Sequence, residues 1–551
     1  MTSRNTTGQL EKKEERRQDY WIWAALIVVL LFTSAIRIRL LRVPLERDEG
    51  EYAYAGQLIL EGIPPYAQAY NMKMPGIYAV YALILAVFGQ TLEGIHLGLL
   101  VVNVAAVLLL FVLARKLFDP LTSVVAAAVF SILSLGQIVN GFAANAEHFV
   151  ILPALAGILL LMRPFERQTR LSVFGGGVLL GVAFLMKQHG AAFIVFAGLY
   201  VLFSELSHRP FIWKSFIAKG ILFLIGVLLP FGMTCLIFWW FGVFERFWFW
   251  TFNYARQYVS AVPLVIGLEN LKTEVVRVAG PAGLIWLFAG IGLISLLWNR
   301  RIRKHSLFMV GFLIFSFLAT CPGLYFRPHY FIFLLPAVAM LAGIGVGSIQ
   351  DLFVRNRRVF LTEAVAVLLT FVILFDAIYK QRNFFFSMSP TKVSRMTYGS
   401  NPFPESLEIA RYIEGNSSKS DLVAILGSEP QILFYANRRS ATGYIYAYPL
   451  MELHPYAFQM QKKMIQEIES AHPEFLVFVN VSASWLAESD SERMILKWFQ
   501  FYHHKYYRLV GVVDIISRDQ TIYRWDKDAV DYQPRSEYWI TVFRRTEIQG
   551  Q

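Results

Sequence analysis

The chain has 551 residues, of which 56% are hydrophobic and only 16% are charged, and its formal net charge is +12. A soluble protein of this size does not need so much apolar surface, so part of the chain is expected to lie in lipid. The positive charge does not indicate nucleic acid binding, because Lys and Arg gather at the ends of apolar runs and form no stripe on a soluble domain.

Long apolar runs predict a helical membrane protein. The first, 21–36, is too long for the core of a signal peptide and lacks a convincing small-residue cleavage site, so it is expected to remain as the first spanning helix. The chain then has about eleven spanning helices, and residues 1–20 form a cytoplasmic tail. The later apolar runs lie at 92–113, 120–140, 148–162, 171–186, 190–204, 217–241, 281–298, 306–321, 330–348 and 359–377.

Basic residues in alternate loops predict the orientation, provided that 76–88 lies at the membrane interface and does not span. Counting 76–88 as a span would reverse every later loop and place these residues outside, against the rule that positive loops face the cytoplasm. An odd number of spans then puts the C-terminus on the outer side. The basic residues concerned are Arg115, Lys116, Arg163, Arg167, Arg170, Arg209, Lys214, Arg300, Arg301, Arg303, Lys304, Arg355, Arg357 and Arg358.

The opposite loops, 41–91, 141–147, 242–280 and 322–329, are richer in Pro, Tyr, Trp and acidic residues, so chemistry is expected there. In the third of them, 244–258 is strongly aromatic and suits a helix in the headgroup layer. The plainer interpretation of these aromatic residues is a membrane-interface belt.

Beyond about residue 385 the long apolar runs stop and Ser, Asn, Pro and acidic residues appear. Helices are predicted at 404–413, 456–470 and 491–502, and strands at 421–427, 475–479, 508–516 and 521–525. This alternation predicts a small α/β domain. The predicted domains are therefore the tail 1–20, a membrane part 21–380 with the first external loop 41–91, and an extracytoplasmic domain 381–551.

Charged residues cluster directly after the first span. Four carboxylates fall within six positions, at Glu46, Asp48, Glu49 and Glu51, and Lys73 follows later in the same loop, before a Pro-Gly turn. At the headgroup layer a carboxylate and a lysine can together deprotonate a hydroxyl and hold a phosphate. The plainer alternative is a solvated charge cluster beside the membrane.

The order of these segments resembles the GT-C polytopic glycosyltransferases, particularly the protein O-mannosyltransferase and aminoarabinose transferase group. Each motif is loose, but their order and their shared side of the membrane strengthen the match. The similar segments are ERDEGEYAY (46–54), GIPPY (62–66), KMPG (73–76), ANAEHF (144–149), GVAFLMKQHG (181–190), FRPHYFIFLLP (326–336) and AILGSEPQILFYANRRSATGY (424–444).

The resemblance implies roles for three residues of the first external loop. Asp48 matches the catalytic base that takes a proton from the acceptor hydroxyl as this attacks the anomeric carbon. Glu49 matches an acidic neighbour that helps to position the substrate, and Lys73 matches a lysine near the carrier phosphate.

Five later residues match substrate-binding positions. Glu147 matches a second acidic position, although many members have aspartate there, and Lys187 matches a lysine at the outer end of a span. Arg327, His329 and Tyr330 match a basic and aromatic segment near the lipid phosphate. The alternatives are that the cations extend toward the interface or pair with Glu147, and that His329 is an ordinary interfacial histidine. We expect Asp48, Lys73, Glu147 and Arg327 to converge on one outward cavity.

The resemblance also implies a reaction. A sugar moves from a polyprenyl-phosphate carrier to a hydroxyl or phosphate of a protein, glycolipid or polysaccharide acceptor, by a single displacement with inversion. Lys73, Arg327 and Lys187 stabilise the departing phosphate, so no cofactor is required. A divalent cation is the alternative, held by the acidic residues Asp48, Glu49 and Glu147.

Two other function classes are considered. A transporter or flippase for lipid-linked sugars would place ionisable residues at mid-membrane and show internal repeats, but the spans here are nearly free of charge in their middles and no repeat is found. A scaffold whose outer domain binds a partner would account for the C-terminal domain but not for the acidic and basic loop residues.

Overall fold

The computed structural model describes residues 3–162, 169–207, 210–354 and 359–546. The basic residues Arg163, Arg167, Arg209, Arg355, Arg357 and Arg358, which contribute to the predicted orientation, lie outside these ranges. The chain divides into two compact units. The first comprises Met1–Leu40, Leu99–Met233 and Ala261–Ser387, and the second comprises Leu41–Gly98, Thr234–Ser260 and Met388–Gln551.

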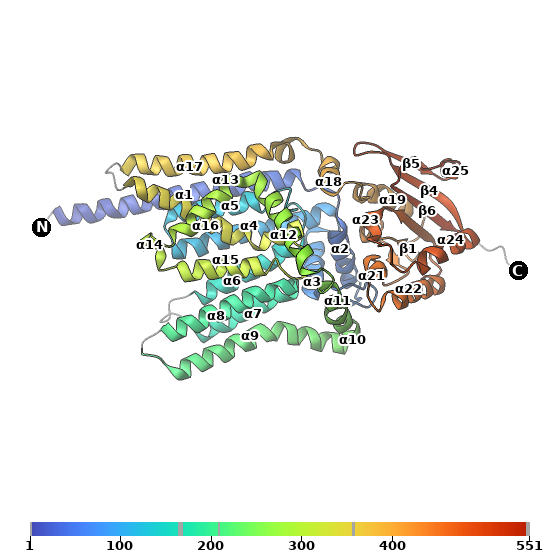
Figure 1. The fold of residues 1–551 in the computed structure, drawn as a ribbon, viewed down its shortest axis with the longest axis horizontal. Coiled ribbons are helices and arrows are strands. Elements are labelled where there is room, and N and C mark those ends of the chain that lie inside the picture. Colours follow the sequence, from blue (N-terminus) through green and yellow to red (C-terminus); the bar gives the residue numbers. More distant parts are fainter. Residues whose placement is uncertain (1–2, 163–168, 208–209, 355–358, 547–551) are drawn as a thin grey trace. The chain divides into compact units, whose positions relative to one another are not determined.

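The first unit is helical (Figure 1). Two helices cross its limits, because α4 begins and α9 ends in the second unit. Its elements are α1 (Ser3–Arg39), α4 (Leu92–Leu117), α5 (Pro120–Leu133), α6 (Ala146–Leu161), α7 (Arg170–Met186), η2 (Gln188–Gly190), α8 (Ala191–Ser207), α9 (Trp213–Trp240), α12 (Leu264–Ala279), η4 (Gly280–Ala282), α13 (Gly283–Ser295), α14 (Arg300–Arg303), α15 (Ser306–Leu318), η5 (Pro328–Phe333), α16 (Leu335–Val354), α17 (Val359–Lys380) and η6 (Asn383–Ser387).

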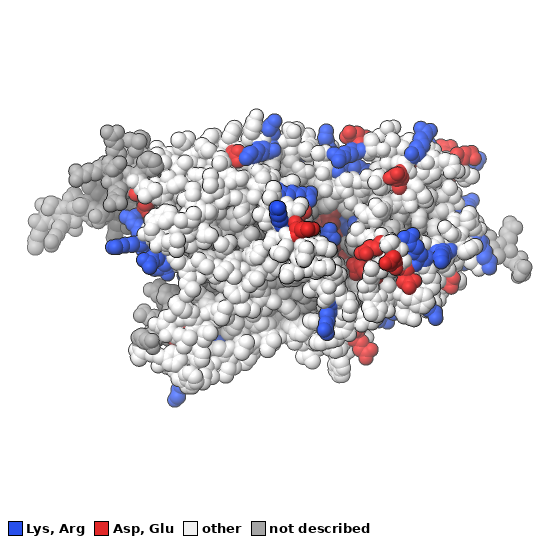
Figure 2. All heavy atoms as spheres, in the orientation of Figure 1, with Lys and Arg blue, Asp and Glu red and all other residues white. Residues whose placement is uncertain are grey.

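Among the described residues, six helical segments are long and apolar enough to cross a membrane. They are Tyr20–Arg39, Leu92–Leu117, Gln188–Ser207, Trp213–Trp240, Leu264–Ser295 and Leu335–Leu352. Shorter apolar helices accompany them at Pro120–Leu133, Ala146–Leu161, Arg170–Met186 and Ser306–Leu318. The predicted helical architecture is therefore confirmed, whereas the count of about eleven spans stays a prediction. Figure 2 shows few charged side chains over most of these helices.

Close helix packing in the first unit depends on small residues. A Cβ atom on Gly292 of α13 would lie 1.9 Å from the Leu341 carbonyl oxygen of α16, and one on Gly345 of α16 would lie 2.2 Å from the Phe288 carbonyl oxygen of α13. Only glycine therefore allows the two backbones to approach so closely, as is common between helices in lipid.

The second unit combines the first external segment with the C-terminal residues. Its helices are α2 (Arg47–Leu60), α3 (Pro75–Phe88), α10 (Phe244–Trp248), η3 (Phe249–Tyr254), α11 (Ala255–Val259), α18 (Pro390–Tyr398), α19 (Phe403–Gly415), α20 (Pro430–Ala436), α21 (Tyr448–Met451), α22 (Ala457–Ala471), α23 (Ser482–Trp485), α24 (Met494–Tyr506) and α25 (Lys527–Val530). Its strands are β1 (Leu422–Leu426), β2 (Arg439–Ser440), β3 (Phe475–Asn480), β4 (Tyr507–Ile515), β5 (Thr521–Trp525) and β6 (Trp539–Arg545). The grouping crosses the sequence-based boundary at residue 381, because 41–98 belongs to the same unit as 388–551.

Helix α3 has 14 residues, too few for a span of roughly 20 residues. It packs against α2, and Gly56 of α2 allows close contact, since a Cβ there would lie 2.9 Å from the Ala82 amide nitrogen. The length agrees with the expectation that 76–88 does not cross the membrane.

The C-terminal residues form the predicted α/β domain. Its six strands lie in the order β2-β1-β3-β6-β4-β5, with β2, β1 and β3 parallel and the remaining neighbours antiparallel. The helices predicted at 404–413, 456–470 and 491–502 correspond to α19, α22 and α24. Both signs of charge lie on the surface of this domain (Figure 2).

The sequence analysis missed strand β6. It lies between β3 and β4, and its apolar residues pair with residues of these strands. For example, Phe543 of β6 pairs with the buried Leu476 of β3. The strands predicted at 508–516 and 521–525 correspond to β4 and β5, but β4 reaches β3 only through β6. A short segment with Arg at its end shows its strand character only once both neighbours are in place.

Leu476 in β3 tests the core of this sheet. Leu476→Ala removes a fully buried side chain and should lower the free energy of unfolding by about 2–5 kcal/mol. The same substitution at Leu453, which is 60% exposed, should change it by less than about 0.5 kcal/mol. Thermal and denaturant unfolding of the purified protein in detergent checks both, and equal effects would contradict the assigned core.

Candidate active site

The predicted acidic cluster lies at the start of α2, and two of its carboxylates cap this helix. Glu46 is the N-cap residue, and its side chain accepts a hydrogen bond from the Glu49 amide at 3.3 Å. In return the Glu49 side chain accepts from the Glu46 amide at 3.2 Å. This capping box satisfies two backbone donors in the first turn of the helix. Burial, together with Asp48 and Glu49, raises the pKa of Glu46 well above its usual range.

Asp48 lies between these two residues and is held from two sides. Its Oδ2 atom is 3.0 Å from Lys73 Nζ, and its Oδ1 atom accepts a hydrogen bond from the Tyr446 hydroxyl at 2.6 Å. The side chains of Asp48 and Lys73 each remain 18% exposed. The structure thus brings together the predicted base and the predicted phosphate-binding lysine, with a tyrosine that the sequence analysis did not single out.

Glu49 is surrounded by protein. It is buried, and its Oε1 atom lies 3.1 Å from His96 Nε2, while His96 Nδ1 lies 2.7 Å from the Leu41 carbonyl oxygen. That Glu49 helps to position substrate stays a prediction, and its side chain contacts the Glu46 amide and His96. His96 lies near the start of α4 and was not predicted, because its partners Leu41 and Glu49 come from a distant part of the sequence.

Glu51 lies one turn further and is fully enclosed. Its two oxygens contact the Tyr78 hydroxyl at 2.5 Å and the Asn71 amide nitrogen at 2.7 Å. Burial raises the pKa of Glu51 to about 8, with Lys73 opposing the rise and Asp48 adding to it. Tyr78 and Asn71 donate these hydrogen bonds, and a protonated Glu51 needs no counter-ion.

This pKa makes stability depend on pH. Because the folded protein binds the Glu51 proton more tightly than the unfolded chain, the stabilisation is complete below the unfolded pKa of about 4.3 and is lost as pH rises to about 8. We expect the unfolding temperature of the wild type to fall relative to Glu51→Gln between pH 5 and 8, since glutamine does not titrate. Parallel curves for the two proteins over this range would refute the raised pKa.

A second group of predicted residues lies in the first unit. Glu147, in the first turn of α6, is fully buried and its Oε1 atom is 2.5 Å from Lys187 Nζ, at the end of α7. Lys187 Nζ also lies 4.2 Å from the ring centre of Tyr330, and His329 Nε2 lies 4.0 Å from the same Glu147 oxygen. Of the interpretations left open for Lys187, pairing with Glu147 is present in the structure.

The η5 segment supplies the remaining predicted residues of this group. Arg327 is its N-cap and lies 5.4 Å from the ring centre of Tyr325. His189 of η2, which the sequence analysis quoted without a role, packs its ring 5.0 Å from Tyr330. Lys187 and the rings of His189 and His329 thus lie around Tyr330. That this group and Asp48 share one cavity stays a prediction.

No group of three or more His, Cys, Asp and Glu residues suited to a metal ion occurs in the part of the chain that the structure describes. The three carboxylates considered above as oxygen ligands contact protein groups. Asp48 contacts Lys73 and Tyr446. Glu49 contacts His96, and Glu147 contacts Lys187.

Sequence comparison matches part of the chain to known proteins. Residues 72–239 match the family model described as dolichyl-phosphate-mannose-protein mannosyltransferase. Over 193 residues the chain is 29% identical to the undecaprenyl phosphate-alpha-4-amino-4-deoxy-L-arabinose arabinosyl transferase of Pseudomonas aeruginosa. This match covers 33% of the chain and 34% of the relative, so the chain aligns with about a third of that protein's length.

Structural comparison extends over most of the chain. The crystal structure of ArnT from Cupriavidus metallidurans bound to undecaprenyl phosphate matches with a TM-score of 0.56 and 16% identity, covering 83% of this chain and 93% of that one. The archaeal oligosaccharyltransferase AglB from Archaeoglobus fulgidus, in complex with an inhibitory peptide and a dolichol-phosphate, matches with a TM-score of 0.54 and 13% identity, covering 94% and 76%. These likenesses establish a shared fold.

Proposed function

Because this chain is a multi-pass membrane protein with the fold of the GT-C polytopic glycosyltransferases, we propose that it transfers a sugar from a polyprenyl-phosphate carrier to an acceptor at the membrane surface. The observation that carries the proposal is the Asp48–Lys73 pair at 3.0 Å, which joins a base and a phosphate-binding cation in one partly exposed group. The names of the relatives support the carrier class, since they include undecaprenyl phosphate and dolichyl phosphate.

The proposed orientation follows from the loop charges. The N-terminus faces the cytoplasm, and Asp48, Lys73 and the C-terminal domain face outward. The polyprenyl chain of the carrier then lies in the membrane, and its phosphate lies at the headgroup layer of the outer leaflet.

Each residue of the pair has a distinct role in the proposed reaction. The acceptor oxygen forms a bond to the anomeric carbon while the bond between that carbon and the phosphate oxygen breaks, and the acceptor proton passes to Asp48. Charge builds up on the leaving phosphate, and the ammonium group of Lys73 stabilises it. An ammonium carries several donors, enough for a carboxylate and a phosphate oxygen at once. Attack from the face opposite the phosphate gives inversion.

The residues around Tyr330 are proposed to bind the donor. Lys187 and Arg327 add positive charge. Glu147 pairs with Lys187 and holds it in place, and His329 and Tyr330 lie beside this pair. The acceptor is a protein, a glycolipid or a polysaccharide. Transport of a lipid-linked sugar is the alternative function, and it would move the lipid without forming a glycosidic bond.

Sugar transfer by Asp48→Asn tests the assignment of the base. Purified protein is given labelled undecaprenyl-phosphate aminoarabinose and polyprenyl-phosphate mannose, with lipid, peptide and polysaccharide acceptors. The asparagine keeps the shape of Asp48 but cannot take the proton, so transfer should fall by about 100-fold or more.

Asp490→Asn, an exposed position in the C-terminal domain, is the matched control and should transfer at the wild-type rate. Equal transfer by Asp48→Asn and wild type would remove Asp48 from the role of base. Movement of labelled lipid across vesicles by a wild type that forms no product would favour the transporter.

We also propose that the reaction needs no metal ion, because Lys73 balances the charge of Asp48 and the Tyr446 hydroxyl occupies its other oxygen. Treatment with EDTA should leave the transfer rate unchanged. A loss of transfer that added Mg²⁺, Mn²⁺ or Zn²⁺ restores would contradict this and point to a carboxylate-bound cation.

A further inference from the structure

The parallel strands of the C-terminal sheet end at an edge of the kind that binds ligands in other proteins. Strands β1 and β3 are parallel neighbours, so the segment Gly427-Ser428-Glu429 after β1 lies beside helix α23 after β3. The Ser428 amide and hydroxyl both bond to Ser484 of α23, at 2.8 Å and 2.6 Å. In open α/β sheets this carboxyl edge is the usual place for a small molecule.

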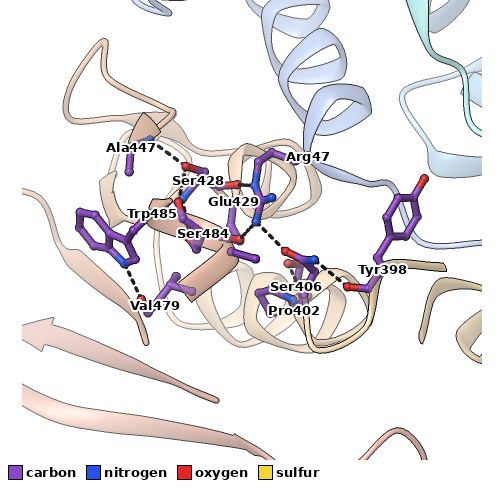
Figure 3. Close-up of polar contacts among 12 residues, drawn as sticks. Arg47, Tyr398, Pro402, Ser406, Ser428, Glu429, Ala447, Val479, Ser484 and Trp485 are labelled. Carbon is purple, nitrogen blue, oxygen red and sulfur yellow. Dashed lines mark hydrogen bonds and ion pairs between the residues drawn. The ribbon is translucent and has the colours of Figure 1, made fainter. Parts of the chain in front are cut away.

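Here Arg47, the neighbour of Asp48, occupies that edge (Figure 3). Its Nε atom donates to the Ser428 carbonyl at 2.5 Å, and its Nη2 atom lies 2.7 Å from Glu429 Oε1. The other oxygen of Glu429 accepts a hydrogen bond from the Ser484 hydroxyl at 2.5 Å. The turn after β1 and the helix after β3 are therefore arranged around the guanidinium of α2.

Further partners complete the enclosure of Arg47. Its Nη1 atom donates to the Tyr448 hydroxyl at 2.6 Å and its Nη2 atom to Asn401 Oδ1 at 3.0 Å, which together with the contacts above uses most guanidinium donors. Arg47 is only 7% exposed. Burial alone would lower its pKa, but Tyr448 and Glu429 raise it above its usual range, so the group stays charged.

The backbone of α2 also approaches the domain closely. A Cβ atom on Gly50 would lie 2.6 Å from the Cβ atom of Gln431 in α20, so the helix carrying Asp48 packs on α20 through a glycine. Gly50, one helical turn after Arg47, therefore also contributes to the packing of α2 against the C-terminal domain.

Tyr446 connects the same edge to Asp48. The backbone next to it is tied to the turn, since the Ala447 amide donates to the Ser428 hydroxyl at 2.8 Å. Tyr446 is 5% exposed, and burial, with Asp48 and Glu51, raises its pKa well above the usual range. Its hydroxyl therefore stays protonated and donates to Asp48 Oδ1 throughout the working range of pH.

From this geometry we propose that the C-terminal domain completes the active site: Tyr446 positions the Asp48 carboxylate, and the Ser428–Glu429 turn holds α2 in place through Arg47. This inference rests on the proposed function and deepens it. In this proposal the carboxyl edge of the sheet binds Arg47 and does not bind the acceptor. Tyr446 is then a positioning residue for Asp48.

The hydrogen bond from Tyr446 favours the charged form of Asp48, so its loss should raise the pH at which this carboxylate titrates. Lys73 acts in the same direction from the segment before α3. The other titratable groups that act on Asp48 are Glu46, Glu49 and Glu51 from α2 and its cap, Tyr78 and Tyr81 from α3, and Tyr398 from α18. All of these remain in a variant that lacks only the Tyr446 hydroxyl.

Tyr446→Phe, assayed in the full-length protein with the labelled polyprenyl-phosphate sugars, is the test. We expect kcat to fall about 10- to 100-fold with little change in the KM for the donor, because a hydrogen bond to a charged group is lost. The acidic limb of the kcat/KM profile should move to higher pH by about one unit. A merely structural role would not move this limb.

Tyr444→Phe is the matched control, because Tyr444 lies in the same segment and packs its ring against Tyr70 and Trp250. It should show the wild-type rate and pH profile. Arg47→Lys keeps the charge but loses the planar donor set and should also lower kcat, whereas Arg42→Lys, with a side chain 80% exposed, should not. Unfolding temperatures of all variants show whether they are folded.

The outcomes separate the two proposals. An active wild type with an unchanged rate and pH profile in Tyr446→Phe would overturn the positioning role and leave the proposed function intact. A wild type that transfers no sugar from either donor would overturn the proposed function and the positioning role with it.

Discussion

The hydrogen-bonded carboxylate of Asp48 is the constraint around which the second unit is organised. One oxygen faces Lys73 and the other faces Tyr446, and these partners come from opposite ends of the sequence. A carboxylate with a partner on each oxygen cannot rotate freely, so its orientation is fixed.

Burying Arg47 next to Asp48 has an energetic cost that its partners offset. A guanidinium removed from water is costly unless its donors are satisfied, and here Ser428, Glu429, Tyr448 and Asn401 satisfy them. A buried ion pair of this kind adds little stability compared with an apolar contact of the same size. Its geometry, in contrast, ties α2 to four separate groups at once, which fixes the position of the helix against the turn.

Particular residues show how far sequence reasoning reaches. The helical architecture, the α/β domain and the nearness of Asp48 to Lys73 were predicted, because apolar runs, alternating patterns and loop position are local signals. The roles of Glu46 and Glu49 in one capping box were not separated from the acidic cluster, although the three-residue spacing of this box is visible in the sequence. Tyr446 was missed, because nothing near it in the chain marks its contact with a residue about 400 positions earlier.

By itself, the sequence determined the membrane character of this protein and the α/β pattern of its C-terminal residues, and it identified Asp48 as the candidate base. Hydropathy, loop charge and residue type are properties of short segments and do not depend on the fold. Only the tertiary structure decided which groups surround Asp48, that β6 lies between β3 and β4, and that the edge of the sheet binds Arg47. These facts arise from contacts between distant segments, whose pairing is set by packing and burial and not by any local pattern.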